Sequence, residues 1–303
     1  MLKILKQSLS TGVVTNSFPA TVSEPPDGFR GKPVIDFARC TACDKCAAVC
    51  PTDAISVQTS QHDPSIPANE KHLSISYGDC IFCGECAAAC PDCITETKEF
   101  FLASANKESL TLRARYRSEP TGDRFLEMVN PPPVTSRETE DLGNELRKRI
   151  HKTFGRSLHI REVDAGSCNG CEIEITALNN AIYDIERFGI HFVASPRHAD
   201  MLLVTGPVTR NMEIALKQTY EATPDPKLVV AVGACAIGGG IFGKSYASCG
   251  GVDTVVPVDV YIPGCPPRPE ALLHGILLAI DRYPANRLST EETSHKRGSK
   301  DTA

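Results

Sequence analysis

The apolar residues of this chain gather in short runs, and the runs after residue 155 alternate with segments long enough to form helices. Four runs stand out: Leu158 to Val163, Met201 to Thr205, Leu228 to Val232 and Val255 to Ile262. Strands that alternate with helices in this way are typical of a largely parallel sheet. The pattern therefore predicts an α/β domain over residues 155–285.

The first half of the chain has shorter apolar runs, and each of them leads into a group of cysteines. Val34 to Phe37 and Leu73 to Tyr77 are predicted strands. The alanine-rich stretches AAVC and AAAC that follow predict brief helices, which Pro51 and Pro91 end because proline cannot continue a helix. We expect a small α+β domain over residues 31–102.

Three further segments connect or flank these domains. Residues 1–30 begin with Leu2, Ile4, Leu5 and Leu9 beside two lysines, a pattern that fits either a plain surface helix or a contact with a membrane partner. Residues 103–154 are interpreted as a linker, irregular from Ala103 to Ser136, then a helix. Its apolar stripe is Leu142, Leu146, Ile150 and Phe154. Residues 286–303 are polar and expected to be disordered.

Composition limits the function. The net charge of -5 points away from nucleic acid. No apolar run is long enough to span a bilayer, and the opening residues lack the pattern of a secretion signal, so we expect a cytoplasmic location. That compartment is reducing, so the 14 cysteines are expected to ligate metal rather than to form disulfides.

Eight of the cysteines form an internal repeat. The run Cys40, Cys43, Cys46, Cys50, Pro51 recurs forty residues later as Cys80, Cys83, Cys86, Cys90, Pro91. Each copy reads C-x2-C-x2-C-x3-C-P, in which three thiolates hold one cubane iron–sulfur cluster and the fourth reaches the other cluster. A pair of zinc sites is the alternative, although zinc prefers pairs of C-x2-C knuckles.

The repeat predicts two ligand sets. Cys40, Cys43, Cys46 and Cys90 are assigned to the first [4Fe-4S] cluster, and Cys80, Cys83, Cys86 and Cys50 to the second. Cys93 lies outside the repeat and is expected to be a spare thiol.

Four cysteines of the α/β half form another group. Cys168 and Cys171 stand in DAGSCNGCEIE, Cys235 in AVGACAIGGG and Cys265 in YIPGCPPRPE, and three of these four cysteines directly follow predicted strands. Ligands from separate strand ends meet at one edge of an open parallel sheet. The surrounding glycines suit backbone that approaches a cluster closely. We therefore expect a third [4Fe-4S] cluster there, with Cys249 as a further non-ligand.

The stretch GGGIFGKS, residues 238–245, fits the phosphate-binding pattern G-x-x-x-x-G-K-[ST]. A phosphate loop needs a helix directly after its Lys and Ser, whose N-terminal amides hold the phosphates. Here Gly250 and Gly251 and a β-rich run follow instead. No nucleotide is expected, and the glycines are assigned to the loop around Cys235.

Residues 31–100 resemble the two-cluster bacterial ferredoxins, and more closely the ferredoxin-like subunit of complex I and its hydrogenase relatives. The motifs SCNGCEIE, LVVAVGACAIGGG and DVYIPGCPPRPE are similar to those of the small subunit of energy-converting [NiFe] hydrogenases, and of the 20 kDa subunit of complex I. The resemblance implies a flavodoxin-like domain in which Cys168, Cys171, Cys235 and Cys265 hold the proximal cluster. Complex I subunits carry adjacent cysteines at the first pair, so the two-residue spacer here favours the hydrogenase branch.

This resemblance implies an electron-transfer subunit, with catalysis in a separate nickel–iron large subunit, membrane subunits as further partners, and a soluble electron donor or acceptor. The location implied is the cytoplasmic side of the inner membrane. Two alternatives stay open: the equivalent subunit of a complex I-like quinone oxidoreductase, and a free soluble multi-cluster carrier. Glu174 matches an acidic position near the large-subunit interface and is a candidate proton relay, with a solvent-facing helical glutamate as the alternative.

Overall fold

Five parallel strands form the sheet of the C-terminal domain in a computed structural model that describes residues 2–17, 24–120, 122–130, 150 and 156–281. The strand order is β11-β10-β9-β7-β8, and each pair is parallel. The strands are β7 (Leu158–Asp164), β8 (Ile190–Phe192), β9 (Met201–Thr205), β10 (Leu228–Val232) and β11 (Val260–Ile262). This confirms the predicted α/β class.

Apolar residues on both faces of the sheet explain why its strands read as continuous runs. Leu203 and Val230 face the core under α5 (Gly170–Ala177) and the helix at residues 269–281, while their neighbours Leu202 and Val229 face α6 (Arg210–Ala222). Successive strand residues point to opposite faces, so a sheet covered on both sides needs apolar residues throughout. The apolar run ending at Ile262 is a strand only in its last three residues, and the short strand β8 was not predicted.

The N-terminal half contains the expected duplicated unit. Its two helices, α2 (Lys45–Ala48) and α3 (Glu85–Ala89), occupy equivalent places in the repeat. β1 (Pro33–Ile35) pairs with β4 (Ile94–Glu96), and a separate antiparallel sheet has the order β2-β3-β5-β6. That sheet contains β2 (Ile55–Thr59), β3 (Glu70–Ser76), β5 (Thr111–Glu119) and β6 (Gly122–Asn130).

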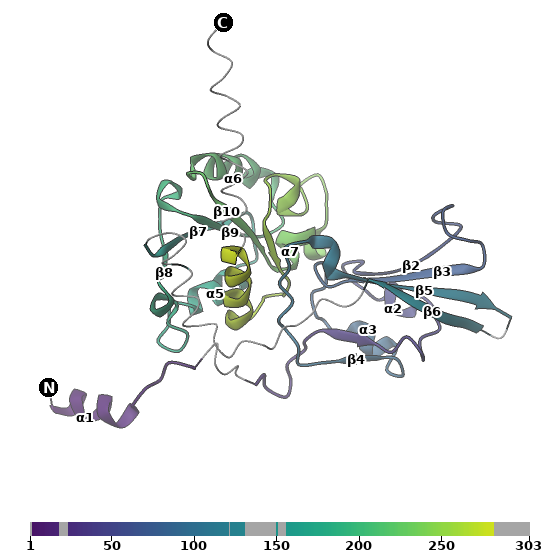
Figure 1. Ribbon diagram of the computed structural model, residues 1–303, viewed down its shortest axis with the longest axis horizontal. Coiled ribbons are helices and arrows are strands. Elements are labelled where there is room, and N and C mark those ends of the chain that lie inside the picture. Colours follow the sequence, from purple (N-terminus) through teal and green to yellow (C-terminus); the bar gives the residue numbers. More distant parts are fainter. Residues whose placement is uncertain (1, 18–23, 121, 131–149, 151–155, 282–303) are drawn as a thin grey trace, which may run out of the picture.

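The interpretation of the chain from Ala103 as an irregular linker is wrong. A 3-10 turn (η1, Lys107–Leu110) leads into β5 and β6, which extend the sheet of the ferredoxin unit as a hairpin (Figure 1). Leu112, Ala114 and Tyr116 are buried, and the arginines between them point outward, so the polar stretch RARYR is a strand with two-residue alternation. Arg113 pairs with Glu108 at 2.8 Å, and Arg115 with Glu70 at 3.0 Å.

Two other expectations fall largely outside the described residues. Of the connecting helix, only Ile150 is described; it is helical and buried. The tail at 286–303 is not described.

The N-terminal helix α1 (Leu2–Thr11) projects from the body, and none of its residues is buried (Figure 1). The chain after it is fixed to the α/β domain at Asn16, whose backbone N–H bonds to Ile182 and whose carbonyl accepts from Arg187. Among the described residues, no helix has the length and apolarity required to cross a bilayer.

The two halves contact each other directly. Ser104 and Tyr261 exchange both backbone hydrogen bonds, at 3.0 and 2.8 Å. Lys107 donates to the carbonyl of Ile237 at 2.6 Å and pairs with Asp253 at 2.9 Å. These contacts hold the N-terminal unit against α7 (Gly233–Gly238), beside the C-terminal cysteines.

Candidate functional site

The first predicted ligand set gathers around α2. Cys40, Cys46 and Cys90 are buried, whereas Cys43 is exposed. Burial, and next the neighbouring Cys90 and Cys40, raises the pKa of Cys46 to about 12. The backbone N–H of Lys45 instead lowers the pKa of Cys43. The structure thus brings Cys40, Cys46 and Cys90 together, and the fourth thiol of the set, Cys43, is exposed to solvent.

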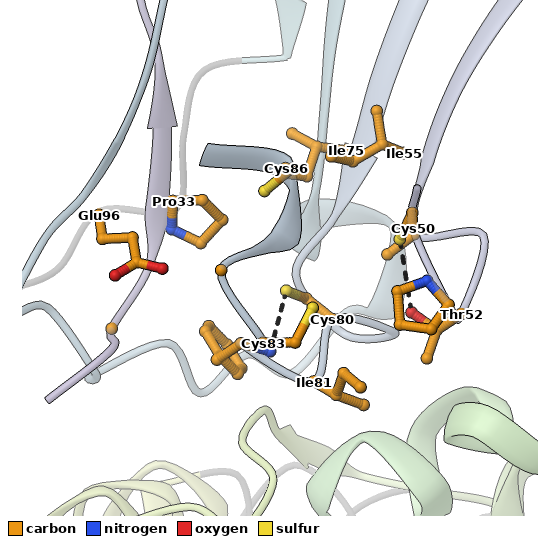
Figure 2. Close-up of a pocket in the computed structure, with 15 residues that line it drawn as sticks. Pro33, Cys50, Thr52, Ile55, Ile75, Cys80, Ile81, Cys83, Cys86 and Glu96 are labelled. Carbon is orange, nitrogen blue, oxygen red and sulfur yellow. Dashed lines mark hydrogen bonds between the residues drawn. The ribbon is translucent and has the colours of Figure 1, made fainter. Parts of the chain in front are cut away.

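The second set lines a small cavity beside α3. Cys50, Cys80, Cys83 and Cys86 surround it, with Ile55 and Ile75 among its apolar walls (Figure 2). Burial raises the pKa of Cys80 to about 12 and that of Cys86 to about 11. The Phe82 backbone N–H points at Cys80 Sγ at 3.3 Å, a contact that would also stabilise sulfur ligated to iron.

The third set lies at the carboxyl edge of the parallel sheet. Cys168 follows β7, Cys171 begins α5, Cys235 lies in α7 after β10, and Cys265 follows β11. Burial, and then Glu172 and Cys235, raises the pKa of Cys171; burial and Cys265 raise that of Cys235 to about 11. Four thiols that follow three separate strands therefore interact with one another.

Two glycines allow the backbone to approach these thiols. A Cβ built on Gly233 would lie 2.7 Å from Cys171 Sγ, and one on Gly240 would lie 2.7 Å from Cys235 Sγ. Both residues have positive φ, which favours glycine. The donor set also fits, because four thiols can bind iron as thiolates; Cys171 and Cys235 are half-buried, whereas Cys168 and Cys265 are exposed. The site residues therefore suit a thiolate-ligated cluster.

The three sets follow one another in space. Cys86 of the second set acts electrostatically on Cys46 of the first, and Cys83 of the second acts on Cys265 of the third. The described residues show no group of three His, Cys, Asp or Glu side chains arranged around a single metal ion. In a cubane cluster each thiolate binds a different iron.

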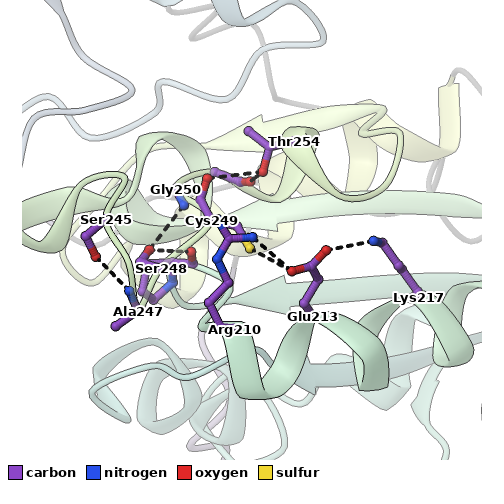
Figure 3. Close-up of polar contacts among 11 residues, drawn as sticks. Arg210, Glu213, Lys217, Ser245, Ala247, Ser248, Cys249, Gly250 and Thr254 are labelled. Carbon is purple, nitrogen blue, oxygen red and sulfur yellow. Dashed lines mark hydrogen bonds and ion pairs between the residues drawn. The ribbon is translucent and has the colours of Figure 1, made fainter.

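The two remaining cysteines have different surroundings. Cys93 lies beside the first set, and burial, then Cys40 and Cys90, raises its pKa to about 11. Cys249 is buried in the core that also contains Leu216 of α6, and it donates to Glu213 Oε2 at 3.3 Å, as Figure 3 shows. Lys217, and then Cys249 and Arg210, lowers the pKa of Glu213 to about 2.

The stretch GGGIFGKS begins at the last residue of α7 and ends at Ser245, beside Ser248 (Figure 3). Its middle is a 3-10 turn (η4, Gly240–Phe242), and the Ser245 N–H bonds to the Ser248 carbonyl at 3.0 Å. The next described element is another 3-10 turn (η5, Val252–Thr254), so the Lys–Ser pair does not open an α-helix. Gly240 lies against Cys235, as expected for a loop around that cysteine.

Glu174 lines a groove between the two halves, together with Tyr183, Cys265 and Arg268. Burial raises the pKa of Glu174, which Arg268 lowers in part. Glu174 is thus half-buried in this groove.

Sequence reasoning missed Glu172, which directly follows Cys171. Its side chain is buried; one oxygen accepts from the Thr205 hydroxyl, and the other has no hydrogen-bond partner among the described residues. Glu172 also contributes to raising the pKa of Glu162, after burial. In α5 the polar and apolar residues do not separate onto two faces, so no pattern in the sequence marks Glu172 as buried.

Comparisons with known proteins identify one family in each half of the chain. Residues 168–279 match the family described as NADH ubiquinone oxidoreductase, 20 Kd subunit. A probable membrane-bound hydrogenase subunit of Pyrococcus furiosus is 52% identical over 146 residues, which cover 46% of this chain and 87% of that relative. This chain belongs to the 20 Kd subunit family. Residues 30–94 match a second family, described as 4Fe-4S dicluster domain, so the resemblance inferred from the motifs is confirmed.

Two further relatives show the range of this family. Formate hydrogenlyase subunit 7 of Escherichia coli is 48% identical over 152 residues, covering 50% of this chain and 59% of that protein. An NADH-quinone oxidoreductase subunit of Citrifermentans bemidjiense is 52% identical over 119 residues, covering 39% of this chain and 69% of that protein. By these names, the relatives are subunits of oxidoreductases.

Proposed function

We propose that this chain is an electron-transfer subunit with three [4Fe-4S] clusters, which relays electrons to or from a nickel–iron site in a separate large subunit. The observation that supports the proposal most is the series of three cysteine sets, in which Cys86 lies near Cys46 and Cys83 near Cys265. Each cluster supplies reversible one-electron chemistry when bound.

Each of the three proposed clusters has four cysteine ligands assigned to it. The first cluster is assigned to Cys40, Cys43, Cys46 and Cys90, the second to Cys80, Cys83, Cys86 and Cys50, and the third to Cys168, Cys171, Cys235 and Cys265. The protein's part is to exclude water and to direct N–H groups at sulfur, as the Ala42 and Phe82 amides do toward Cys40 and Cys80 at 3.4 and 3.3 Å. Cys43 of the first set and Cys168 and Cys265 of the third set are exposed, so both ends of the series are open to a partner or to an external donor or acceptor.

Glu174 is proposed to hold a proton beside the third set. Its carboxyl group lines the groove next to Cys265, and burial raises its pKa, which is the property a proton-holding carboxylate needs near neutral pH. The positive charge of Arg268 lowers the pKa of Glu174 and so opposes the larger effect of burial.

Association with the membrane is assigned to partner subunits and to residues 1–30. The apolar side chains of α1 are exposed, with Leu2 at 83% and Leu9 at 77%, and Lys3 and Lys6 stand among them. An amphipathic helix with no buried residue suits the surface of a membrane partner. A peripheral position on the cytoplasmic side of the inner membrane follows from this proposal.

A complex I-like quinone oxidoreductase is the second candidate, because a subunit of an NADH-quinone oxidoreductase is also a relative. The same relay would serve either complex. The spacer of two residues between Cys168 and Cys171 favours the hydrogenase branch.

Metal analysis of the native complex separates the candidates. After anaerobic purification through a tag on this chain, we expect about twelve irons from this chain plus one nickel and one iron from the partner. The variant Cys235→Ser should lose about four irons, whereas the matched control Cys249→Ser should lose none. Iron without nickel would favour the quinone-reducing complex, and a chain purified without partners would favour a free carrier.

A further inference from the structure

A row of aromatic rings crosses the boundary between the two halves. The ring centroids of Phe29 and Phe100 are 5.8 Å apart, those of Phe100 and Phe101 are 4.4 Å apart, and those of Phe101 and His274 are 5.5 Å apart. The three phenylalanines flank the ferredoxin unit, whereas His274 belongs to the helix at 269–281. The two halves are also close at Gly275, where a built Cβ would lie 3.5 Å from the Ala103 Cβ.

Arg268 of the C-terminal domain lies over this row. Its guanidinium carbon is 5.4 Å from the Phe29 centroid and 4.9 Å from the Phe100 centroid. On its own side, Nε faces Glu270 Oε2 at 3.4 Å, and the Glu270 side chain is fully buried. The guanidinium is therefore held by a buried carboxylate from one half and by two rings from the other.

This contact adjoins two of the cysteine sets. Arg268 follows Cys265 by three residues, and the segment from Pro263 to Pro269 contains four prolines, whose rings restrict the backbone. On the other side, Arg30, next to Phe29, donates to the backbone carbonyl of Cys83. A groove of about 450 Å³ lies between the two sides and is lined by Arg30, Phe82, Cys265 and Arg268.

We propose that Arg268 is a positioning residue, whose stacking on Phe29 and Phe100 holds Cys83 of the second set at a fixed distance from Cys265 of the third. The inference rests on the proposed function, because it concerns transfer between two clusters that these cysteines would hold. The proline-rich segment restricts the backbone between Arg268 and Cys265, so fixing the guanidinium also fixes Cys265. The hydrogen bond from Arg30 to the Cys83 carbonyl links the neighbouring Phe29 to Cys83 in the same way. Electron transfer between the clusters depends on that separation.

Arg268 also brings a positive charge near Cys265, and the two effects can be separated by substitution. Arg268→Met removes the charge and the cation–π contacts. Arg268→Lys keeps the charge, and its ammonium group can still make a cation–π contact with the rings, although it lacks the planar face of the guanidinium. Phe100→Leu keeps the charge and the apolar character but removes one ring. Arg197→Met is the matched control, because Arg197 is exposed and lies on the 3-10 turn Pro196–His198, outside the groove.

The test uses the native complex, fully reduced, with electron paramagnetic resonance as the readout. The wild-type spectrum should show magnetic interaction between the second and third clusters, since such interaction depends on their separation. Arg268→Met and Phe100→Leu should weaken or lose it while keeping about twelve irons, and Arg268→Lys and Arg197→Met should keep it. The reduction potential of the third cluster should fall in Arg268→Met and not in Phe100→Leu.

The iron content and the magnetic interaction together distinguish a failure of the positioning role from a failure of the proposed function. Unchanged magnetic interaction in both Arg268→Met and Phe100→Leu, with full iron content, overturns the positioning role. So does a wild-type protein with full iron content and no interaction. An iron content well below twelve in the wild type contradicts the proposed function instead. If Arg268→Met does not retain its iron, Phe29→Leu and Phe100→Leu carry the same test, because both leave the charge in place.

Discussion

At the scale of single residues, the third cysteine set depends on glycines that leave room for the cysteine sulfur atoms. Gly240 has φ +54°, and a Cβ there would lie 2.7 Å from Cys235 Sγ and 3.3 Å from its Cα. A free thiol could turn away from such a methyl group, but a thiol bound to iron could do so only by leaving the cluster.

We therefore expect Gly240→Ala to lose the third cluster, about four of the twelve irons. Gly189→Ala is the matched control: Gly189 has φ +74°, and its nearest neighbour to a built Cβ is Ser157 Oγ at 3.9 Å. Both variants carry a backbone penalty of about 1 kcal/mol, so iron analysis of the purified variants separates that strain from the clash. Equal iron in the two variants would show that the glycine does not serve the cluster.

The residues that the sequence predicted best are those with fixed spacing. The cysteine repeat and the strand-end cysteines follow from counting, because ligation requires these spacings. Glu172 and Arg268 follow no such rule. Their roles come from burial against Thr205 and from stacking on Phe29 and Phe100, contacts made between residues distant in the chain.

At the scale of elements, the main difference from the sequence-based expectation is the hairpin of β5 and β6, which was expected to be irregular. This hairpin also packs beside the first cysteine set. Tyr116 of β5 is fully buried, packs edge-on against Phe125 of β6 with centroids 5.7 Å apart, and has its pKa raised by burial and by Cys40. Strands β9 and β10 were predicted to the residue because they are buried on both faces. β5 is buried on one face only. Its three arginines alternate with buried residues, so the segment looked polar and was not predicted as a strand.

Removing the Tyr116 ring should weaken the ferredoxin unit. Tyr116→Ala leaves a cavity beside Cys40 and should cost about 3–5 kcal/mol, the range for large aromatic truncations. We expect the absorbance of the cluster to bleach faster on anaerobic heating than in the wild type. The rate of bleaching is the appropriate measure of stability, because it applies even when unfolding is irreversible. Tyr116→Phe keeps the ring and should bleach nearly as slowly as the wild type. Bleaching of Tyr116→Ala at the wild-type rate would mean that the hairpin does not support the cluster.

At the scale of the whole molecule, the two halves differ in what fills their cores. The core of the ferredoxin unit includes Cys40, Cys46, Cys86 and Cys90, all proposed ligands. The two cores of the α/β domain are mainly aliphatic, with Leu203 and Val230 on one face of the sheet and Leu202 and Val204 on the other. Apolar burial alone can stabilise such a sheet, whereas iron ligation contributes directly to the stability of a small unit built around thiols.

Iron removal should therefore unfold one half and spare the other. After treatment with a chelator under reducing conditions, we expect the amides of β3 and α3 to lose their protection from hydrogen exchange while those of β9 and β10 remain protected. The first pair belongs to the core that contains four ligand thiols, whereas the second pair lies mainly between aliphatic side chains. Exchange followed by mass spectrometry of peptides resolves the two halves, with the untreated protein as reference. Simultaneous loss of protection in β9 and β10 would show that the contacts of Lys107 and Ser104 bind the halves into one cooperative unit.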